Sequence, residues 1–238
     1  LYGDHFRVIC GDCGITFRCD AEAFPADRRA VCPNCGFRDN ALRDEDLRRG
    51  DRVLVDTWPY LWSRPRRFDV VMLVNPNRQF EAEPNPYAVK RIAPPQLDIR
   101  HGDLYVGNKQ LPKSLAELRQ MAVLVHDNDF LPRSASDPRR WSATAPHGNW
   151  QIAGGGFHFA APAKTNGDDT QWLAYQHWRC DSSPLARTVS EQILDNDGYN
   201  QGYTRLLNDV NDILLVCTVK GSQGVFTMQL RDQGTVCA

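Results

Sequence analysis

The sequence lacks long apolar runs and any strong excess of charge of one sign. No stretch of its 238 residues approaches the roughly 18–20 consecutive apolar residues that span a bilayer. The formal net charge is -1, so the chain as a whole gives no electrostatic reason to expect nucleic-acid binding. We therefore expect a folded globular protein without a nucleic-acid partner.

The chain also lacks an initiator methionine and a secretory leader. It opens on Leu1, and no charged-then-apolar leader segment follows. We expect Leu1 to be an internal start, with any membrane anchor lying upstream of it. The length allows one large or two modest domains, each with a core.

What the sequence does contain is an uneven set of eight cysteines. Four of them form two Cys-x-x-Cys pairs, each followed by glycine, with 18 residues between the pairs. A tight turn of this kind points two thiolates at one ion, and the glycine supplies a positive φ. The spacing predicts a zinc ribbon over about residues 5–38. The expected ligands are Cys10, Cys13, Cys32 and Cys35.

Four thiolates leave no open coordination position, so the predicted zinc is structural rather than catalytic. The alternatives are two disulfides or four free thiols. The paired Cys-x-x-Cys spacing favours a metal site over both. Cys19 is a further thiol nearby, but it has no Cys-x-x-Cys partner. Apart from Arg28-Arg29 the ribbon is not notably basic, which argues against a nucleic-acid-binding ribbon.

Three short β-branched runs occupy the middle of the chain. They are Gly50-Asp51-Arg52-Val53-Leu54-Val55, Pro65 to Leu73, and Tyr87-Ala88-Val89-Lys90-Arg91-Ile92, and we expect strands at 52–55, 68–74 and 87–92. The third run places Lys90 inside an apolar strand. Such a lysine is costly unless it is paired, reaches water or is kept neutral for chemistry. On composition alone, a solvent-facing lysine paired with an acid is the simplest interpretation.

The remaining chain predicts further short elements. A Gly107-Asn108 turn indicates a hairpin, and the capping box at Ser114 begins a helix that runs to about Met121. From Trp141 onwards the pattern predicts an antiparallel β-sandwich like those of jelly rolls and lectin-like modules. Its expected strands are 150–152, 157–161, 172–178, 213–219 and 225–230, with a hairpin loop at 220–224. His158 and His177 are interpreted as core-edge or surface residues rather than ligands.

The middle of the chain resembles the bacterial signal peptidase I family of serine–lysine proteases. Gly50 to Val55 resembles the family's Gly-Asp-x-Val-Leu-Val strand, and Arg66-Arg67-Phe68-Asp69-Val70-Val71 is similar to its Arg-Gly-Asp-Val-Val segment. Tyr87 to Ile92 resembles the Tyr-Val-Lys-Arg-Ile segment, which carries the family's general base. The resemblance therefore implies that Lys90 is the catalytic base.

The same resemblance implies the rest of a function. The nucleophilic serine would precede Leu1, since Leu1-Tyr2-Gly3 fits the residues just after the family's Ser-Met-x-Pro-Thr-Leu motif. The implied activity is cleavage of signal peptides, bound as extended segments, by a membrane-anchored endopeptidase. The implied location is the extracytoplasmic side of the bacterial cytoplasmic membrane. A zinc ribbon between the serine segment and the Gly-Asp strand resembles a divergent, planctomycete-like subgroup.

The implied architecture is mainly β: a signal-peptidase-like barrel or sheet core with an inserted ribbon and a C-terminal sandwich-like region. The expected domains are 1–49, 50–130 and 141–238. The chain departs from the family where Ala93-Pro94-Pro95-Gln96-Leu97 replaces Gly-Leu-Pro-Gly-Asp, and where the Ser-x-Asp-Ser-Arg segment is absent. An alternative hypothesis is a non-catalytic zinc-ribbon and β-sandwich module that binds protein or carbohydrate.

Overall fold

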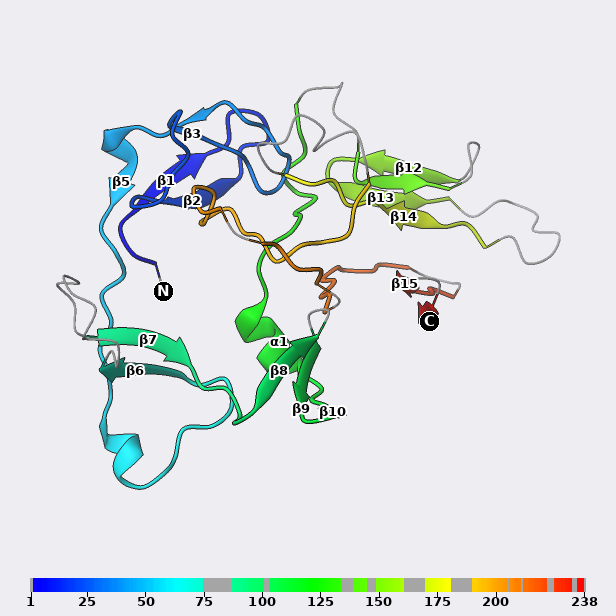
Figure 1. Ribbon diagram of the computed structural model, residues 1–238. Coiled ribbons are helices and arrows are strands. Elements are labelled where there is room, and N and C mark those ends of the chain that lie inside the picture. Colours follow the sequence, from blue (N-terminus) through cyan, green and yellow to red (C-terminus); the bar gives the residue numbers. More distant parts are fainter. Residues whose placement is uncertain are drawn as a thin grey trace. The chain divides into compact units, whose positions relative to one another are not determined.

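A computed structural model of the chain shows a mainly β protein whose described sheets have two or three strands (Figure 1). The described residues are 2–74, 87–100, 103–133, 139–144, 149–160, 170–180, 190–204, 206–210, 212–221, 225–232 and 235–237. The chain divides into two compact units. Unit 1 comprises Leu1–Asp51 and Val123–Asp209, and unit 2 comprises Arg52–Ala122 and Val210–Ala238.

Unit 1 is built around a small antiparallel sheet. Strands β1 (His5–Ile9) and β2 (Thr16–Asp20) pair directly, and β5 (Leu47–Arg48) adds to the other edge of β1. Residues alternate in these strands, so Phe6 and Val8 of β1 point into the core. The short strands β3 (Arg29–Ala30) and β4 (Asn40–Ala41) form a second pair.

The later part of unit 1 adds two separate antiparallel strand pairs. Strand β11 (Trp141–Ala143) pairs with β14 (Leu173–Tyr175), and β12 (Trp150–Ala153) pairs with β13 (Gly156–Phe159). Aromatic side chains join these pairs, because the Trp141 ring lies 5.1 Å from Tyr175 and 5.6 Å from Phe157.

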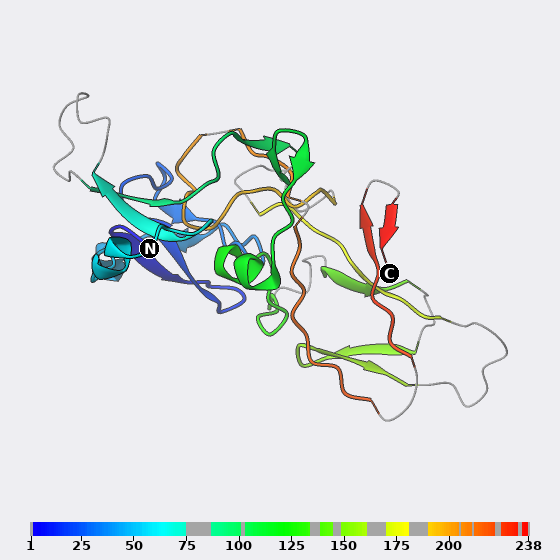
Figure 2. The same cartoon turned by 90° about the horizontal axis from the view of Figure 1, so that it is seen from below.

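Unit 2 contains the segments that resemble the peptidase motifs. Strands β6 (Val70–Val74) and β7 (Tyr87–Arg91) form an antiparallel pair. A three-stranded meander follows, made of β8 (Leu97–Arg100), β9 (Asp103–Val106) and β10 (Lys109–Gln110). Near the end of the chain, β15 (Leu230–Asp232) pairs with β16 (Thr235–Cys237) (Figure 2).

The α-helix α1 (Leu115–Met121) of unit 2 begins at the predicted capping box. The Glu117 amide donates to Ser114 Oγ at 3.3 Å, and the Ser114 amide donates to Glu117 Oε2 at 2.8 Å. The guanidinium of Arg67 also donates to both carboxylate oxygens of Glu117 at 3.0 Å. Glu117 therefore caps the N-terminus of α1 and also binds Arg67 of the loop that precedes β6. Within the described parts of the chain, no helix has the length and apolarity that a membrane crossing needs.

The strands predicted at 68–74 and 87–92 are confirmed over Val70–Val74 and Tyr87–Arg91, and the hairpin predicted at Gly107-Asn108 is formed by β9 and β10. The strand predicted at Arg52–Val55 is wrong: the segment pairs with no strand among the described residues, and Leu54 is fully exposed. Its β-branched composition fits a strand, but a strand also needs a partner to satisfy its backbone groups.

The sandwich expected from Trp141 onwards is also not formed by the residues that the structure describes. The predicted strands at 213–219 and 225–230 have no ladder partner over 213–219 and 225–229, and only Leu230 belongs to a strand. The pairs β11–β14 and β12–β13 remain separate two-stranded sheets, and neither grows into a sandwich layer. The predicted loop at 220–224 lies partly outside the described residues, which omit 222–224.

Candidate metal centre

The two Cys-x-x-Cys segments fold into turns with the same backbone pattern. In the first, the Gly14 amide donates to the Cys10 carbonyl at 3.1 Å, and in the second the Gly36 amide donates to the Cys32 carbonyl at 2.8 Å. Gly14 has φ of 79° and Gly36 has φ of 73°, the left-handed region that glycine enters without steric cost. The predicted role of both glycines is confirmed.

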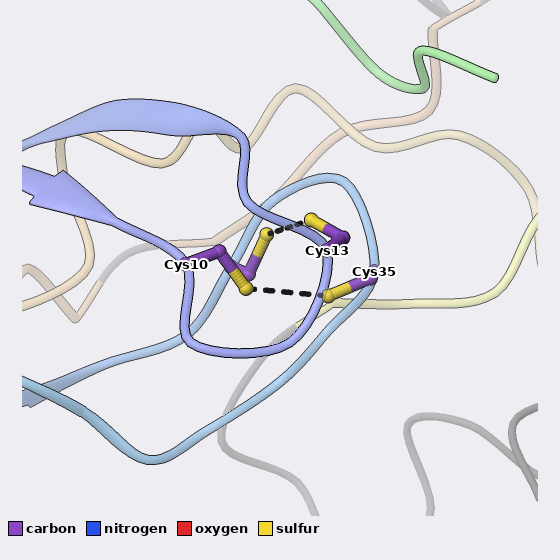
Figure 3. Close-up of side chains that lie close together, drawn as sticks. Cys10, Cys13 and Cys35 are labelled. Atoms are coloured by element: carbon purple, nitrogen blue, oxygen red, sulfur yellow. Dashed lines mark hydrogen bonds between the residues drawn. The ribbon is translucent and has the colours of Figure 1, made fainter. Parts of the chain in front are cut away.

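These turns bring the four predicted ligands together. Their Sγ atoms all lie within 4.8 Å of one another, and Cys10, Cys13 and Cys32 are buried. Cys10 Sγ lies 3.6 Å from Cys35 Sγ, and Cys13 Sγ lies 3.7 Å from Cys32 Sγ, so each close contact joins one turn to the other (Figure 3). A tetrahedral ion with metal–sulfur bonds of about 2.3 Å places neighbouring sulfurs about 3.8 Å apart. The cluster can therefore hold a metal ion, and its size is compatible with zinc.

The cluster also favours the ionised form of at least one thiol. Hydrogen bonds from the Cys13, Cys32 and Cys35 thiols hold the pKa of Cys10 well below its usual range. The contact with Cys10 raises the pKa of Cys13, but those with Cys32 and Cys35 lower it, and the net result is a pKa of about 7. The same coupling raises the pKa values of Cys32 and Cys35. Since metal ions bind thiolates, this cluster is electrostatically suited to a cation that completes the ionisation.

Two buried asparagines, which sequence reasoning missed, hold the turns that carry the sulfurs. Asn34 is 1% exposed, and its Nδ2 atom lies 3.8 Å from Cys13 Sγ, to which it donates. Asn40 receives the Gly11 amide at 3.0 Å and donates to the carbonyls of Ala30 and Phe37, each at 2.9 Å. Asn40 therefore connects the first Cys-x-x-Cys turn to the strands beside the second.

Two distant segments of unit 1 dock on the second turn through side-chain amides. Asn34 donates to the Phe130 carbonyl at 2.8 Å and accepts from the Asp127 amide at 2.7 Å. Gln201 accepts from the Val31 amide at 2.6 Å and donates to the Val31 carbonyl at 2.7 Å, as a neighbouring strand would. No local sequence pattern predicts these contacts, because the residues that make them are far apart in the chain.

Cys19 is not part of the cluster. It is fully buried on β2 within the apolar core, and burial, reinforced by the charge of Asp20, raises the pKa of its thiol to about 12. It therefore stays protonated and packs as a small apolar residue. Cys10, Cys13, Cys32 and Cys35 form no disulfide in this structure.

Lys90 lies elsewhere, on β7 of unit 2. It is exposed and stands opposite Val71 of β6, which is 5% exposed. Tyr87 and Val89, the neighbouring apolar residues of the same strand, are also exposed. Within the described part of the chain, no carboxylate forms an ion pair with Lys90. The structure thus groups the four cysteines within unit 1, whereas Lys90 belongs to unit 2.

Comparison of the chain with protein-family models, curated proteins and solved structures gives no match.

Proposed function

We propose that the chain is part of a serine–lysine endopeptidase of the signal peptidase I type, with Lys90 as the general base. The register of the β6–β7 pair is the observation that supports the proposal best. Two motifs that are separate in sequence pair directly, with Val70 opposite Arg91 and Val71 opposite Lys90. The nucleophilic serine would come from a segment that precedes Leu1, and the substrate would be the signal peptide of an exported protein.

The exposed apolar surface of this strand pair agrees with such a role. The apolar residues exposed on it are Val70, Met72, Leu73, Val74, Tyr87 and Val89. Exposed strands of this composition suit an extended peptide or a further segment of the protein that adds alongside them. Covering the pair in this way would desolvate Lys90 and lower its pKa, and a neutral amine could then take the serine proton.

The four-cysteine cluster would serve this enzyme as a structural zinc site. Cys10, Cys13, Cys32 and Cys35 would hold the ion, which supplies cross-links and no open position for chemistry. Catalysis would take place on the extracytoplasmic side of the bacterial cytoplasmic membrane, where an upstream anchor would hold the chain. There the buried position of three of the four thiols would limit their oxidation.

A matched pair of lysine substitutions tests the proposal. A chain extended upstream to include its serine segment would be assayed with a preprotein in detergent or vesicles. Lys90→Ala should reduce cleavage by at least about 10³-fold, because the serine loses its base. Lys109→Ala, which removes an exposed lysine from strand β10, should leave cleavage unchanged. Equal activity of the two variants would refute the assignment of Lys90.

A non-catalytic binding module is the second candidate, and the exposure of Lys90 favours it. In this case the aromatic group of Trp141, Phe157 and Tyr175 would be the first place to seek a protein or carbohydrate contact. This candidate predicts that the extended wild-type chain cleaves no preprotein, although its metal content is complete. Cleavage by the wild-type chain would exclude it.

A further inference from the structure

Unit 1 buries an arginine whose contacts include no carboxylate in the part of the chain that the structure describes. Arg140 is 6% exposed. Its Nη1 donates to the Tyr175 hydroxyl at 3.2 Å and to His177 Nδ1 at 2.9 Å, and its Nη2 donates to Cys180 Sγ at 2.8 Å. A buried guanidinium is costly unless an anion or a full set of hydrogen bonds compensates it.

Of the three groups that contact the guanidinium, two stay neutral near pH 7. Burial raises the pKa of Tyr175 above its usual value, so its hydroxyl keeps its proton. Burial, together with the charge of Arg140, lowers the pKa of His177 to about 4. Neutral His177 can then accept through Nδ1, as its contact with Arg140 requires. The thiol of Cys180 is the remaining contact that can become an anion.

We propose that Cys180 is held as a thiolate by the guanidinium of Arg140 and is a site of modification by peroxides. Proximity to a guanidinium is an established way to favour a thiolate, and the thiolate is the reactive form of cysteine. Cys180 is half-buried, so a small reagent can reach the sulfur while the protein holds Arg140 in place. This inference does not depend on the proposed peptidase activity.

The reaction needs only the thiolate and a hydroperoxide. The sulfur attacks one oxygen of hydrogen peroxide, an S–O bond forms and the O–O bond breaks. The second oxygen leaves as hydroxide, and the proton that the attacked oxygen carried stays on the resulting sulfenic acid. Sulfur is oxidised by two electrons and the peroxide is reduced by two.

Two other basic side chains of this region have contacts of their own among the described residues. Arg179, the preceding residue, has Glu191 as an ion-pair partner at 3.7 Å. His126 lies behind Tyr175, with ring centroids 6.0 Å apart, and burial and the Arg140 charge lower its pKa to about 4. The Cys180 sulfur also lies 3.6 Å from the Trp178 carbonyl, to which the protonated thiol would donate.

Cys217 provides an internal reference in the same chain, because it is a free and exposed cysteine. The metal-loaded protein would be pulsed with iodoacetamide between about pH 6 and 9. The extent of alkylation of each cysteine would be measured by peptide mass spectrometry. An ordinary thiol with a pKa near 8.5 is only about 1% ionised at pH 6.5. Allowing for the lower nucleophilicity of a low-pKa thiolate, Cys180 should react about tenfold faster than Cys217 at pH 6.5, although it is less exposed.

Two further measurements complete the test. Arg140→Met should slow alkylation of Cys180 at pH 6.5 by at least about tenfold, whereas Arg140→Lys, which keeps the charge, should slow it less. After treatment with hydrogen peroxide, dimedone should label Cys180 in preference to Cys217. Equal alkylation rates for the two cysteines of the wild-type chain at pH 6.5 would overturn the proposal that Cys180 is a thiolate. This outcome does not rely on any variant. Equal or absent dimedone labelling overturns the peroxide reaction.

Discussion

At the scale of single residues, Asn34 connects the metal cluster to the rest of unit 1. Its amide contacts a cluster sulfur on one side and the turn at Asp127–Phe130 on the other. The Cys-x-x-Cys spacing was sufficient to predict which four cysteines come together, because each pair is brought to one side by a local turn. The role of Asn34 was not predictable, because its partners lie 93 and 96 residues further along the chain.

Substitution of Asn34 should therefore weaken unit 1. Asn34→Ala leaves the Asp127 amide and the Phe130 carbonyl without their partner, and should lower the free energy of unfolding by about 2–3 kcal/mol. Urea denaturation followed by tryptophan fluorescence and by zinc release would measure the loss. Asn108→Ala, in an exposed turn of unit 2, is the control and should cost less than about 1 kcal/mol. A loss for Asn34→Ala no larger than that of the control would contradict this role.

At the scale of elements, the outward face of the β1–β2 pair carries an unfavourable charge arrangement. Arg7 of β1 stands directly opposite Arg18 of β2, and both side chains are exposed. Like charges in directly opposed positions of an antiparallel pair repel each other. Arg18 has a compensating contact, because its guanidinium lies 4.6 Å from the ring centre of Tyr2.

Reversal of the charge at position 7 should therefore stabilise the sheet. Arg7→Glu creates an opposite-charge pair with Arg18 and should raise the free energy of unfolding by on the order of 0.5 kcal/mol at low salt. Arg7→Gln only removes the repulsion, so its free energy of unfolding should lie between those of the wild type and Arg7→Glu. Thermal unfolding at about 20 mM and about 500 mM salt, where the screening length is about 20 Å and about 4 Å, would measure both. A gain that persists unchanged at high salt would show that the effect is not electrostatic.

Elements with local causes were predictable, and elements that depend on a distant partner were less so. The capping box fixed the start of α1, and the Gly107-Asn108 turn fixed the β9–β10 hairpin, because both rest on contacts within a few residues. Residues 52–55 and 213–219 have equally strand-like compositions but no partner strand in the described chain. Composition alone does not show whether a partner is available.

At the scale of the whole molecule, the main apolar core of unit 1 includes three residues of the four-cysteine cluster. The main buried cluster consists of residues from the ribbon and its flanking strands, and it includes Cys10, Cys13 and Cys32 themselves. Phe130, from the docked turn, packs against the same cluster. Structural zinc supplies about 10–16 kcal/mol of apparent binding free energy in small ribbons, which is comparable with the whole stability of a domain.

Removal of the metal should therefore unfold unit 1. Treatment with a strong zinc chelator should abolish hydrogen-exchange protection in β1 and β2, whereas amides of the β9–β10 hairpin should keep theirs. Native reduced protein should contain one zinc per chain, by elemental analysis. Cys10→Ser should lose the zinc and Cys217→Ser should retain it. Full metal content in Cys10→Ser, or protection of β1 that survives chelation, would exclude a structural zinc in this cluster.

The long separation of the ribbon from its docking partners has a consequence for biosynthesis. The four ligands lie within the first 35 residues, so they can close around an ion soon after this part of the chain leaves the ribosome. The backbone of Val31 must then wait for Gln201, which is synthesised 170 residues later. At about 5–20 residues per second this delay lasts roughly 10–35 seconds. During that interval the backbone groups of Val31 would lack the partner that Gln201 later supplies, in a ribbon that a bound metal ion would already hold folded.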